Sequence, residues 1–155
     1  MKDAEKDAVR EQVRKRYADV ARSGGGCCGV DGCCTPDAMS NPDVSAMIGY
    51  TRDDIAAVPE GANMGLGCGN PQAIAKLKMG ETVIDLGSGG GFDCFLAARQ
   101  VGAAGRVIGV DMTPDMISKA RANARRGEFR NVEFRLGEIE HLPVADQSAD
   151  VIMSN

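Results

Sequence analysis

The 155-residue sequence has no excess of basic charge, which argues against a broad nucleic-acid-binding surface. Its formal net charge is −4 and its pI is about 5.0, whereas nucleic-acid-binding domains cluster lysine and arginine. No apolar run reaches the roughly 20 residues that a membrane-spanning helix needs. Residues 1–16 are charged throughout and have no apolar signal core. We therefore expect a cytoplasmic protein with no nucleic-acid and no membrane partner.

Histidine is also nearly absent, and there are no internal repeats or low-complexity tracts. The one histidine, His141, is expected to be a loop or surface residue and not a general base. Hydrophobic residues make up 43% of the chain, which is enough for a packed core. The length suits one domain of ordinary size.

Cysteine, by contrast, is concentrated. Four of the six cysteines lie within the eight residues CCGVDGCC, namely Cys27, Cys28, Cys33 and Cys34. In the cytoplasm thiols stay mostly reduced, so the cluster is more typical of a metal or catalytic site than of a disulfide frame. A structural zinc site is a rival interpretation, but adjacent cysteines fit its spaced C-x2-C pairs poorly. Cys68 lies in the segment NMGLGCGNP, and Cys94 is expected to be a buried small side chain.

Alternating strands and helices are expected from residue 82 onward. The strands are expected at 82–86, 106–110, 132–136 and 151–153, and the helices at 92–100 and 114–126, the latter capped by Thr113. This order predicts an α/β fold with a parallel sheet and right-handed crossovers. Upstream, a helix is expected over 3–21 and shorter ones near 44–48 and 71–77, with a short acidic helix or a turn at 51–58. An apolar stripe on the first helix, expected to pack on the domain, consists of Val9, Val13, Tyr17 and Val20.

The turn after the first expected strand is rich in glycine. A dinucleotide fingerprint needs glycine at the first, third and sixth places, but the sixth place counted from Gly87 is Phe92. The pattern acid-x-Gly-x-Gly-x-Gly fits instead, and it is typical of methyltransferases that use S-adenosylmethionine. Such a turn lets the backbone approach a cofactor closely. The cofactor-binding candidates in this turn are Asp85, Gly87, Ser88, Gly89 and Gly91.

Two further candidate segments follow the next two expected strands. Asp111, in VIGVDMT, stands where this fold places an acid that accepts the ribose hydroxyls, and Met112 would pack on the adenine. In FRLGEIEHLP, the residues Gly137, Ile139 and Glu140 would approach the adenine edge. The three segments occur in order at the carboxyl ends of successive strands. Together they predict an S-adenosylmethionine site.

The motifs GGGCCG…CC, NMGLGCGNP, VIDLGSGGGFDCFLAA, GVDMTPDMISKAR and GEIEHLPVAD…DVIMSN together resemble arsenite S-adenosylmethionine methyltransferases. The similarity spans nearly the whole chain. Its specific part is GLGCGNP with the upstream double-cysteine loop, since the glycine turn and Asp111 occur in many methyltransferases. The resemblance implies a class I S-adenosylmethionine-dependent methyltransferase fold with a Rossmann-like sheet, and arsenic detoxification by methylation of arsenic(III). It divides the chain into a helical, cysteine-rich lid, residues 1–70, and an incomplete cofactor-binding domain, residues 71–155.

The resemblance also implies roles for the cysteines. Cys68 matches the family's cysteine in the GCG segment and is expected to be an arsenic ligand or redox partner. One cysteine of the 27/28/33/34 cluster should match the family's N-terminal redox cysteine, with Cys33 or Cys34 favoured, and the cluster as a whole is a candidate arsenic-binding group. The implied substrate is arsenite or its glutathione conjugate, and a thiol reductant such as thioredoxin is a candidate partner.

The family uses two further cysteines, one of them soon after the segment that matches DVIMSN. This sequence ends at Asn155, so we expect a fragment whose sheet is cut after the fourth strand. Two other functions remain open from the sequence. A carbon or oxygen methyltransferase of the quinone-biosynthesis type would share the cofactor half but leave five lid cysteines without a role. A non-catalytic thiol trap or sensor for soft metalloids would bind them through the cysteines and would retain the methyltransferase fold without its activity.

Overall fold

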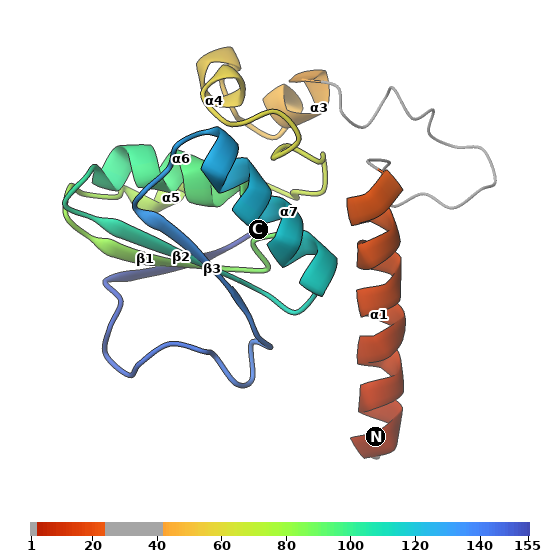
Figure 1. The fold of residues 1–155 in the computed structure, drawn as a ribbon. Helices are drawn as coiled ribbons and strands as arrows, with labels where there is room; N and C mark the ends of the chain where they lie inside the picture. Colours follow the sequence, from red (N-terminus) through yellow and green to blue (C-terminus); the bar gives the residue numbers. More distant parts are fainter. Residues whose placement is uncertain (1–2, 24–41) are drawn as a thin grey trace.

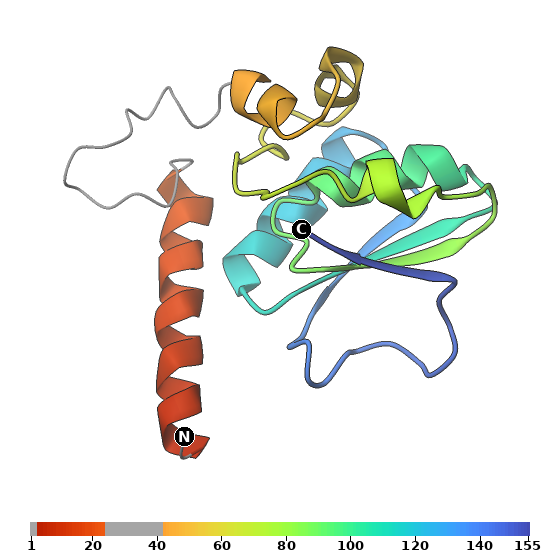
Figure 2. The same ribbon diagram turned by 180° about the vertical axis from the view of Figure 1, so that it is seen from behind.

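The computed structural model describes residues 3–23 and 42–155. A long helix, α1 (Asp3–Ser23), stands beside an α/β body (Figures 1 and 2). The strands of the body are β1 (Thr82–Leu86), β2 (Arg106–Asp111), β3 (Val132–Leu136) and β4 (Val151–Ser154). Its helices are α3 (Pro42–Met47), α4 (Arg52–Ala56), α5 (Gln72–Ala75), α6 (Phe92–Val101) and α7 (Pro114–Arg126).

All strand pairs in the sheet are parallel, and the strand order is β3-β2-β1-β4. From β1 the chain moves outward through β2 to β3 and then returns to the other side of β1 as β4. Asp85 of β1 therefore lies opposite both Gly109 of β2 and Met153 of β4. This reversal creates a topological switch point at the carboxyl end of β1, where open α/β sheets bind ligands.

The expected elements agree with the observed ones to within two residues at each end. The α/β class and the parallel sheet are confirmed. The expected cap of α7 is wrong in one respect: Thr113 precedes the helix in extended backbone, but its side chain makes no capping hydrogen bond. A full capping box occurs instead at α4, where Thr51 and Asp54 bond to each other's backbone N–H groups.

The larger core lies between the sheet and the helices α6 and α7. Phe95 is fully buried, and its ring centroid lies 4.7 Å from that of Phe129 and 5.7 Å from that of Phe134. Val83 and Val107 of the central strands complete this layer and are also fully buried. Because α6 begins directly after the glycine turn, this packing fixes the turn relative to the sheet.

The opposite face of the sheet is covered by the connection between β3 and β4 (Figures 1 and 2). Ile84, Ile108 and Val110 point to this side and are buried against Leu142 and Val144 of that connection. Both faces of the central strands are therefore shielded from water, which parallel sheets require.

The strand β3 forms one edge of the sheet and is lined with charged groups. Arg121 of α7 donates from Nε and Nη2 to the carbonyl oxygen of Phe134, at 3.2 and 2.7 Å. On the strand itself, Glu133 accepts hydrogen bonds from Arg135 and Arg106. These hydrogen bonds lower the pKa of Glu133 to about 2.

The contact of α1 with the body differs from the expected apolar stripe. Val20 is buried, but Val9 is 52% exposed and Tyr17 is 41% exposed. Near its end the helix is held by polar contacts to α7: Arg22 pairs with Asp115 at 2.8 Å. Within residues 3–23 and 42–155, no helix has the length and apolar character needed to cross a membrane.

The substitution Phe95→Ala is expected to lower the free energy of unfolding by about 3–5 kcal/mol, because it leaves a cavity between three aromatic rings. Urea denaturation followed by circular dichroism would measure this. Met79→Ala, at a side chain that is 80% exposed, serves as the control and should change stability by less than about 0.5 kcal/mol. Equal losses in the two variants would contradict the proposed core.

Candidate functional site

A cleft of about 450 Å³ opens at the carboxyl ends of β1, β2 and β3. The glycine turn forms its floor, and residues 111–113 and 137–140 form one wall. The side of the cleft opposite the glycine turn is lined by residues 62–67 and by two side chains of α1, Arg10 and Tyr17. The cleft therefore brings together the three predicted cofactor segments and adds groups from residues 10–67, upstream of the sheet.

The glycine turn is tied to the neighbouring strand. The N–H groups of Gly87 and Ser88 donate to the carbonyl oxygen of Val110, at 2.8 and 3.1 Å. Gly87 and Gly89 have positive φ values of 74° and 51°, which glycine adopts without strain. A Cβ atom at either position would meet nothing within 4 Å. Both glycines thus leave open space on the cleft side of the turn.

Gly91 has a different environment from the other two glycines. A Cβ atom there would lie 2.7 Å from the Cζ atom of Phe134, and Gly91 is buried. The structure places this residue against the core and away from the cleft surface. Its glycine character is explained by close packing beneath the turn.

Asp111 is the last residue of β2, and its carboxylate stabilises the turn. Its Oδ2 accepts from the N–H of Gly89 at 3.0 Å, and its Oδ1 accepts from the N–H of Thr113 at 2.8 Å. A carboxylate oxygen has more than one acceptor site, so the carboxylate can still accept hydrogen bonds from a ligand in the cleft. Met112 lines the same wall.

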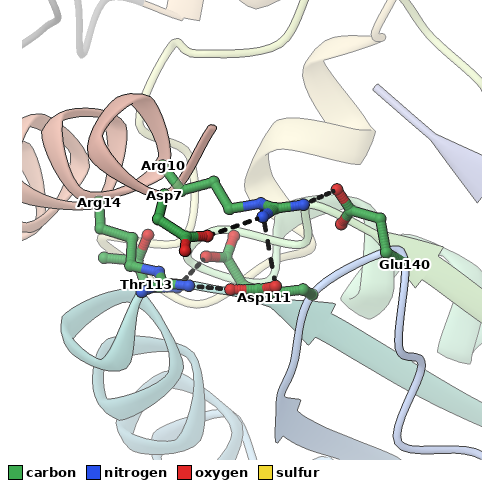
Figure 3. Close-up of polar contacts among 7 residues, drawn as sticks. Asp7, Arg10, Arg14, Asp111, Thr113 and Glu140 are labelled. Carbon is green, nitrogen blue, oxygen red and sulfur yellow. Dashed lines mark hydrogen bonds and ion pairs between the residues drawn. The ribbon is translucent and has the colours of Figure 1, made fainter. Parts of the chain in front are cut away.

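The segment after β3 is bound to α1 by ion pairs that the sequence did not reveal (Figure 3). Arg10 donates to Glu140 at 2.6 Å. In a second ion pair, Arg14 donates to Glu138. The contact with Arg10 lowers the pKa of Glu140. We call these contacts the α1 clasp. Ile139 lies between the two clasped residues and Gly137 directly before them, and both line the cleft. The helix α1 therefore covers the part of the cleft that the sequence predicts to contact adenine.

Two buried acids lie under the turn. Asp85 is 2% exposed and accepts a hydrogen bond from the Cys94 thiol at 3.2 Å. Burial raises the pKa of Asp85 to about 8, and the nearby charge of Asp93 adds to this effect. Cys94 is fully buried, as expected, and burial raises the pKa of its thiol.

The second acid, Asp93, belongs to a polar network with Tyr50 and Asn155. The Tyr50 hydroxyl donates to Asp93 at 2.6 Å, and Asn155 Nδ2 lies 3.0 Å from Asp93 Oδ2. Asn155 Oδ1 accepts from the backbone N–H groups of Cys68 and Gly69, both at 2.8 Å. Sequence reasoning missed Asn155. Its position directly after the strand expected at 151–153 was the signal that could have found it.

Cys68 is exposed and lies at the rim of the cleft. Its neighbour Gly67 lines the cleft, as does Asn155, whereas Cys68 itself does not. Within the described part of the chain, no three His, Cys, Asp or Glu side chains come together as a metal-binding group. His141 is exposed, in agreement with the expectation. The predicted cysteines Cys27, Cys28, Cys33 and Cys34 lie outside the described residues.

The cleft has the features that an adenosine-containing cofactor needs. Ser88 Oγ is buried and has no hydrogen-bond partner within residues 3–23 and 42–155. The turn offers backbone beside open space, Asp111 offers an acceptor, and Met112 and Ile139 offer apolar contact. A cleft that combines hydrogen-bond donors, an acceptor and apolar side chains suits a charged nucleoside ligand.

A family model described as a methyltransferase domain matches residues 77–155. The chain belongs to the methyltransferase domain family. Its sequence is 56% identical to that of an arsenite methyltransferase of Halobacterium salinarum. The match covers 99% of this chain and 41% of that relative. The chain is 43% identical to an arsenite methyltransferase of Aquipseudomonas alcaligenes, over 73% of the chain and 34% of the relative. The chain thus spans less than half the length of these curated relatives.

Among solved structures, the methyltransferase domain is similar to an arsenic(III) S-adenosylmethionine methyltransferase from Chlamydomonas reinhardtii. The TM-score is 0.52 at 34% sequence identity, and the match covers 74% of this chain and 38% of that one. The expected class I S-adenosylmethionine-dependent methyltransferase fold is therefore confirmed, and S-adenosylmethionine is the cofactor of this fold class.

The stability of the domain is expected to fall as pH rises from about 4 to about 8. The folded state keeps a proton on Asp85, whose pKa is raised to about 8, while the unfolded chain loses it near pH 3.8. The free energy of unfolding should therefore decrease by up to about 1.4 kcal/mol per pH unit in this window. Asp85→Asn should flatten the decrease, whereas Asp146→Asn, at an exposed carboxylate, should not. Urea titrations at several pH values would measure the free energy of unfolding. If its dependence on pH were unchanged in Asp85→Asn, Asp85 would not be the cause of the decrease.

Breaking the α1 clasp should loosen α1 without unfolding the body. In Glu138→Gln the carboxylate that pairs with Arg14 is lost, so the amide hydrogens of residues 3–23 should exchange faster. High salt should have a similar effect on the wild type, because exposed ion pairs are screened. Hydrogen exchange read by mass spectrometry would test this, with Glu60→Gln as the control. Unchanged exchange in α1 would show that the α1 clasp does not hold the helix.

Proposed function

We propose that this domain is the cofactor-binding part of an arsenite methyltransferase, which transfers methyl groups from S-adenosylmethionine to trivalent arsenic held by cysteine thiolates. The observation that carries the proposal is the Cys68 loop. Its backbone is bonded to Asn155, a residue of the cleft, so that an exposed thiol stands beside the cofactor site. The names of the Halobacterium and Chlamydomonas proteins support the same assignment.

The cofactor would be held by groups on three sides of the cleft. The backbone of residues 87–89 would approach its amino-acid part, with the buried Ser88 hydroxyl as a further partner. Asp111 would accept the ribose hydroxyls, and Met112 and Ile139 would contact the adenine. The cofactor supplies an electrophilic methyl carbon next to a positively charged sulfur. Because α1 and residues 62–67 cover the cleft, they would exclude water from the methyl carbon and the sulfur of the cofactor.

The cysteines would hold and orient the arsenic substrate. Thiolates are soft ligands that suit thiophilic centres, and trivalent arsenic with three sulfur ligands keeps a lone pair. That lone pair would form the bond to the methyl carbon while the bond from this carbon to the cofactor sulfur breaks. The electron pair of the broken bond would return to sulfur and neutralise its charge, so no side chain has to remove a proton. The buried, hydrogen-bonded acids Asp85 and Asp93 are then not needed as general bases. Cys68 is the proposed arsenic ligand, with Cys33 or Cys34 as redox partner and the rest of the cluster as further candidate ligands.

The proposed partners follow from the same chemistry. Arsenite would arrive as a thiol conjugate such as that with glutathione, because ligand exchange then transfers arsenic from one thiol to another. Methylation uses the arsenic lone pair and leaves arsenic pentavalent, so each further round needs two electrons from a thiol reductant, for which thioredoxin is the proposed source.

Cys68→Ser tests the proposal in the intact protein. With arsenite, glutathione and cofactor carrying a radiolabelled methyl group, the variant should transfer label to arsenic about 100-fold more slowly or not at all, because arsenic is no longer held in line. Its affinity for the cofactor, measured by calorimetry, should match the wild type. Ile74→Ser, at a side chain that is 83% exposed, should keep full transfer.

Other outcomes would identify the alternatives. Stoichiometric arsenite binding by the wild type without label transfer would indicate a thiol trap. Label found on a quinone precursor and never on arsenic would indicate a carbon or oxygen methyltransferase. Full transfer in Cys68→Ser would overturn the role of Cys68.

A further inference from the structure

One carboxamide joins the cysteine loop to the floor of the cleft. Asn155 Oδ1 accepts from the N–H groups of Cys68 and Gly69, and its Nδ2 lies 2.9 Å from the carbonyl oxygen of Gly69. The same Nδ2 lies 3.0 Å from Tyr50 Oη and 3.0 Å from Asp93 Oδ2. A single side chain thereby contacts both the segment that bears the exposed thiol and the first turn of α6.

The loop lies so close to this carboxamide that a side chain at position 67 would not fit. A Cβ atom on Gly67 would lie 2.7 Å from Asn155 Nδ2, well inside van der Waals contact. The backbone of Gly67 therefore packs directly against the carboxamide group of Asn155.

The carboxamide itself is held by rigid structure. Asn155 follows β4, which pairs in parallel with the central strand β1, and the neighbouring Ser154 hydroxyl donates to the carbonyl oxygen of Leu86 at 3.0 Å. On the other side, Asp93 and Tyr50 are both buried. A loop bonded to such an anchor is far better ordered than an exposed glycine-rich loop would otherwise be.

We propose that Asn155 is a positioning residue: it fixes the backbone of Cys68 at the rim of the cleft and thereby sets where the thiol stands relative to the transferred methyl group. The catalytic part of this inference rests on the proposed function. The structural part, a clamp on the Cys68 backbone, does not depend on arsenic.

The clamp is tested first without substrate. In Asn155→Ala the amide hydrogens of Cys68 and Gly69 lose their acceptor, so they should exchange about tenfold faster or more. Amide exchange resolved by NMR would measure this. Ser154→Ala removes the adjacent side-chain hydrogen bond, which does not involve the loop, and should leave both amides at the wild-type rate.

The positioning role is tested by kinetics. Asn155→Ala should lower kcat for methyl transfer to arsenic about tenfold to 100-fold, with the cofactor dissociation constant unchanged within about threefold. Asn155→Asp keeps an acceptor for Cys68 and Gly69 but loses the donor to Asp93, so its kcat should lie between those of the wild type and Asn155→Ala. Gly67→Ala should displace the loop and reproduce the loss with Asn155 intact, which covers the case in which Asn155→Ala does not fold.

Each outcome is decisive. Unchanged exchange at Cys68 and Gly69 in both Asn155→Ala and Gly67→Ala overturns the clamp. Faster exchange with unchanged kcat overturns the positioning role. If the wild type transfers no methyl group to arsenic, the proposed function fails and the positioning role fails with it, while the exchange rates still decide the clamp separately.

Discussion

Parallel pairing of β1 with strands on both sides is the constraint on which the site depends. Because β2 and β4 run in the same direction as β1, the carboxyl ends of these strands meet at one edge of the sheet. The turn after β1, Asp111 at the end of β2 and Asn155 after β4 are brought together in this way. The backbone bonds from Gly87 and Ser88 to Val110 then fix the turn to its neighbour. In an antiparallel sheet these groups would lie at opposite edges, and no common cleft would form.

The floor of this cleft carries polar groups that a purely structural core would avoid. Burying a carboxyl group is unfavourable unless hydrogen bonds compensate for lost hydration. Asp93 receives such bonds from Tyr50 and Asn155, while Asp85 receives one from the weak donor Cys94. The raised pKa of Asp85 shows that compensation there is incomplete. Sites that sacrifice stability in this way are typically the functional ones.

The sequence predicted the features that are local in the chain. Hydrophobic spacing placed the strands, and the glycine turn and Asp111 could be recognised from their neighbours alone. The features it missed join distant segments: Asn155 is 87 residues from Cys68, and Arg10 is 130 residues from Glu140. Such contacts exist only after the sheet has formed and α1 has docked. Tyr17 shows the same limit, since a helical stripe does not reveal that a cleft replaces the core beneath it.

The contact of the Arg121 guanidinium of α7 with the edge strand β3 has a consequence for aggregation. Unpaired carbonyl groups on an edge strand can recruit a strand from a second molecule and so begin aggregation. Arg121 occupies the carbonyl oxygen of Phe134, and the charges of Glu133 and Arg135 flank it. An incoming strand would have to displace a charged donor and bury ionised groups. This part of β3 is therefore less open to pairing with a strand of a second molecule.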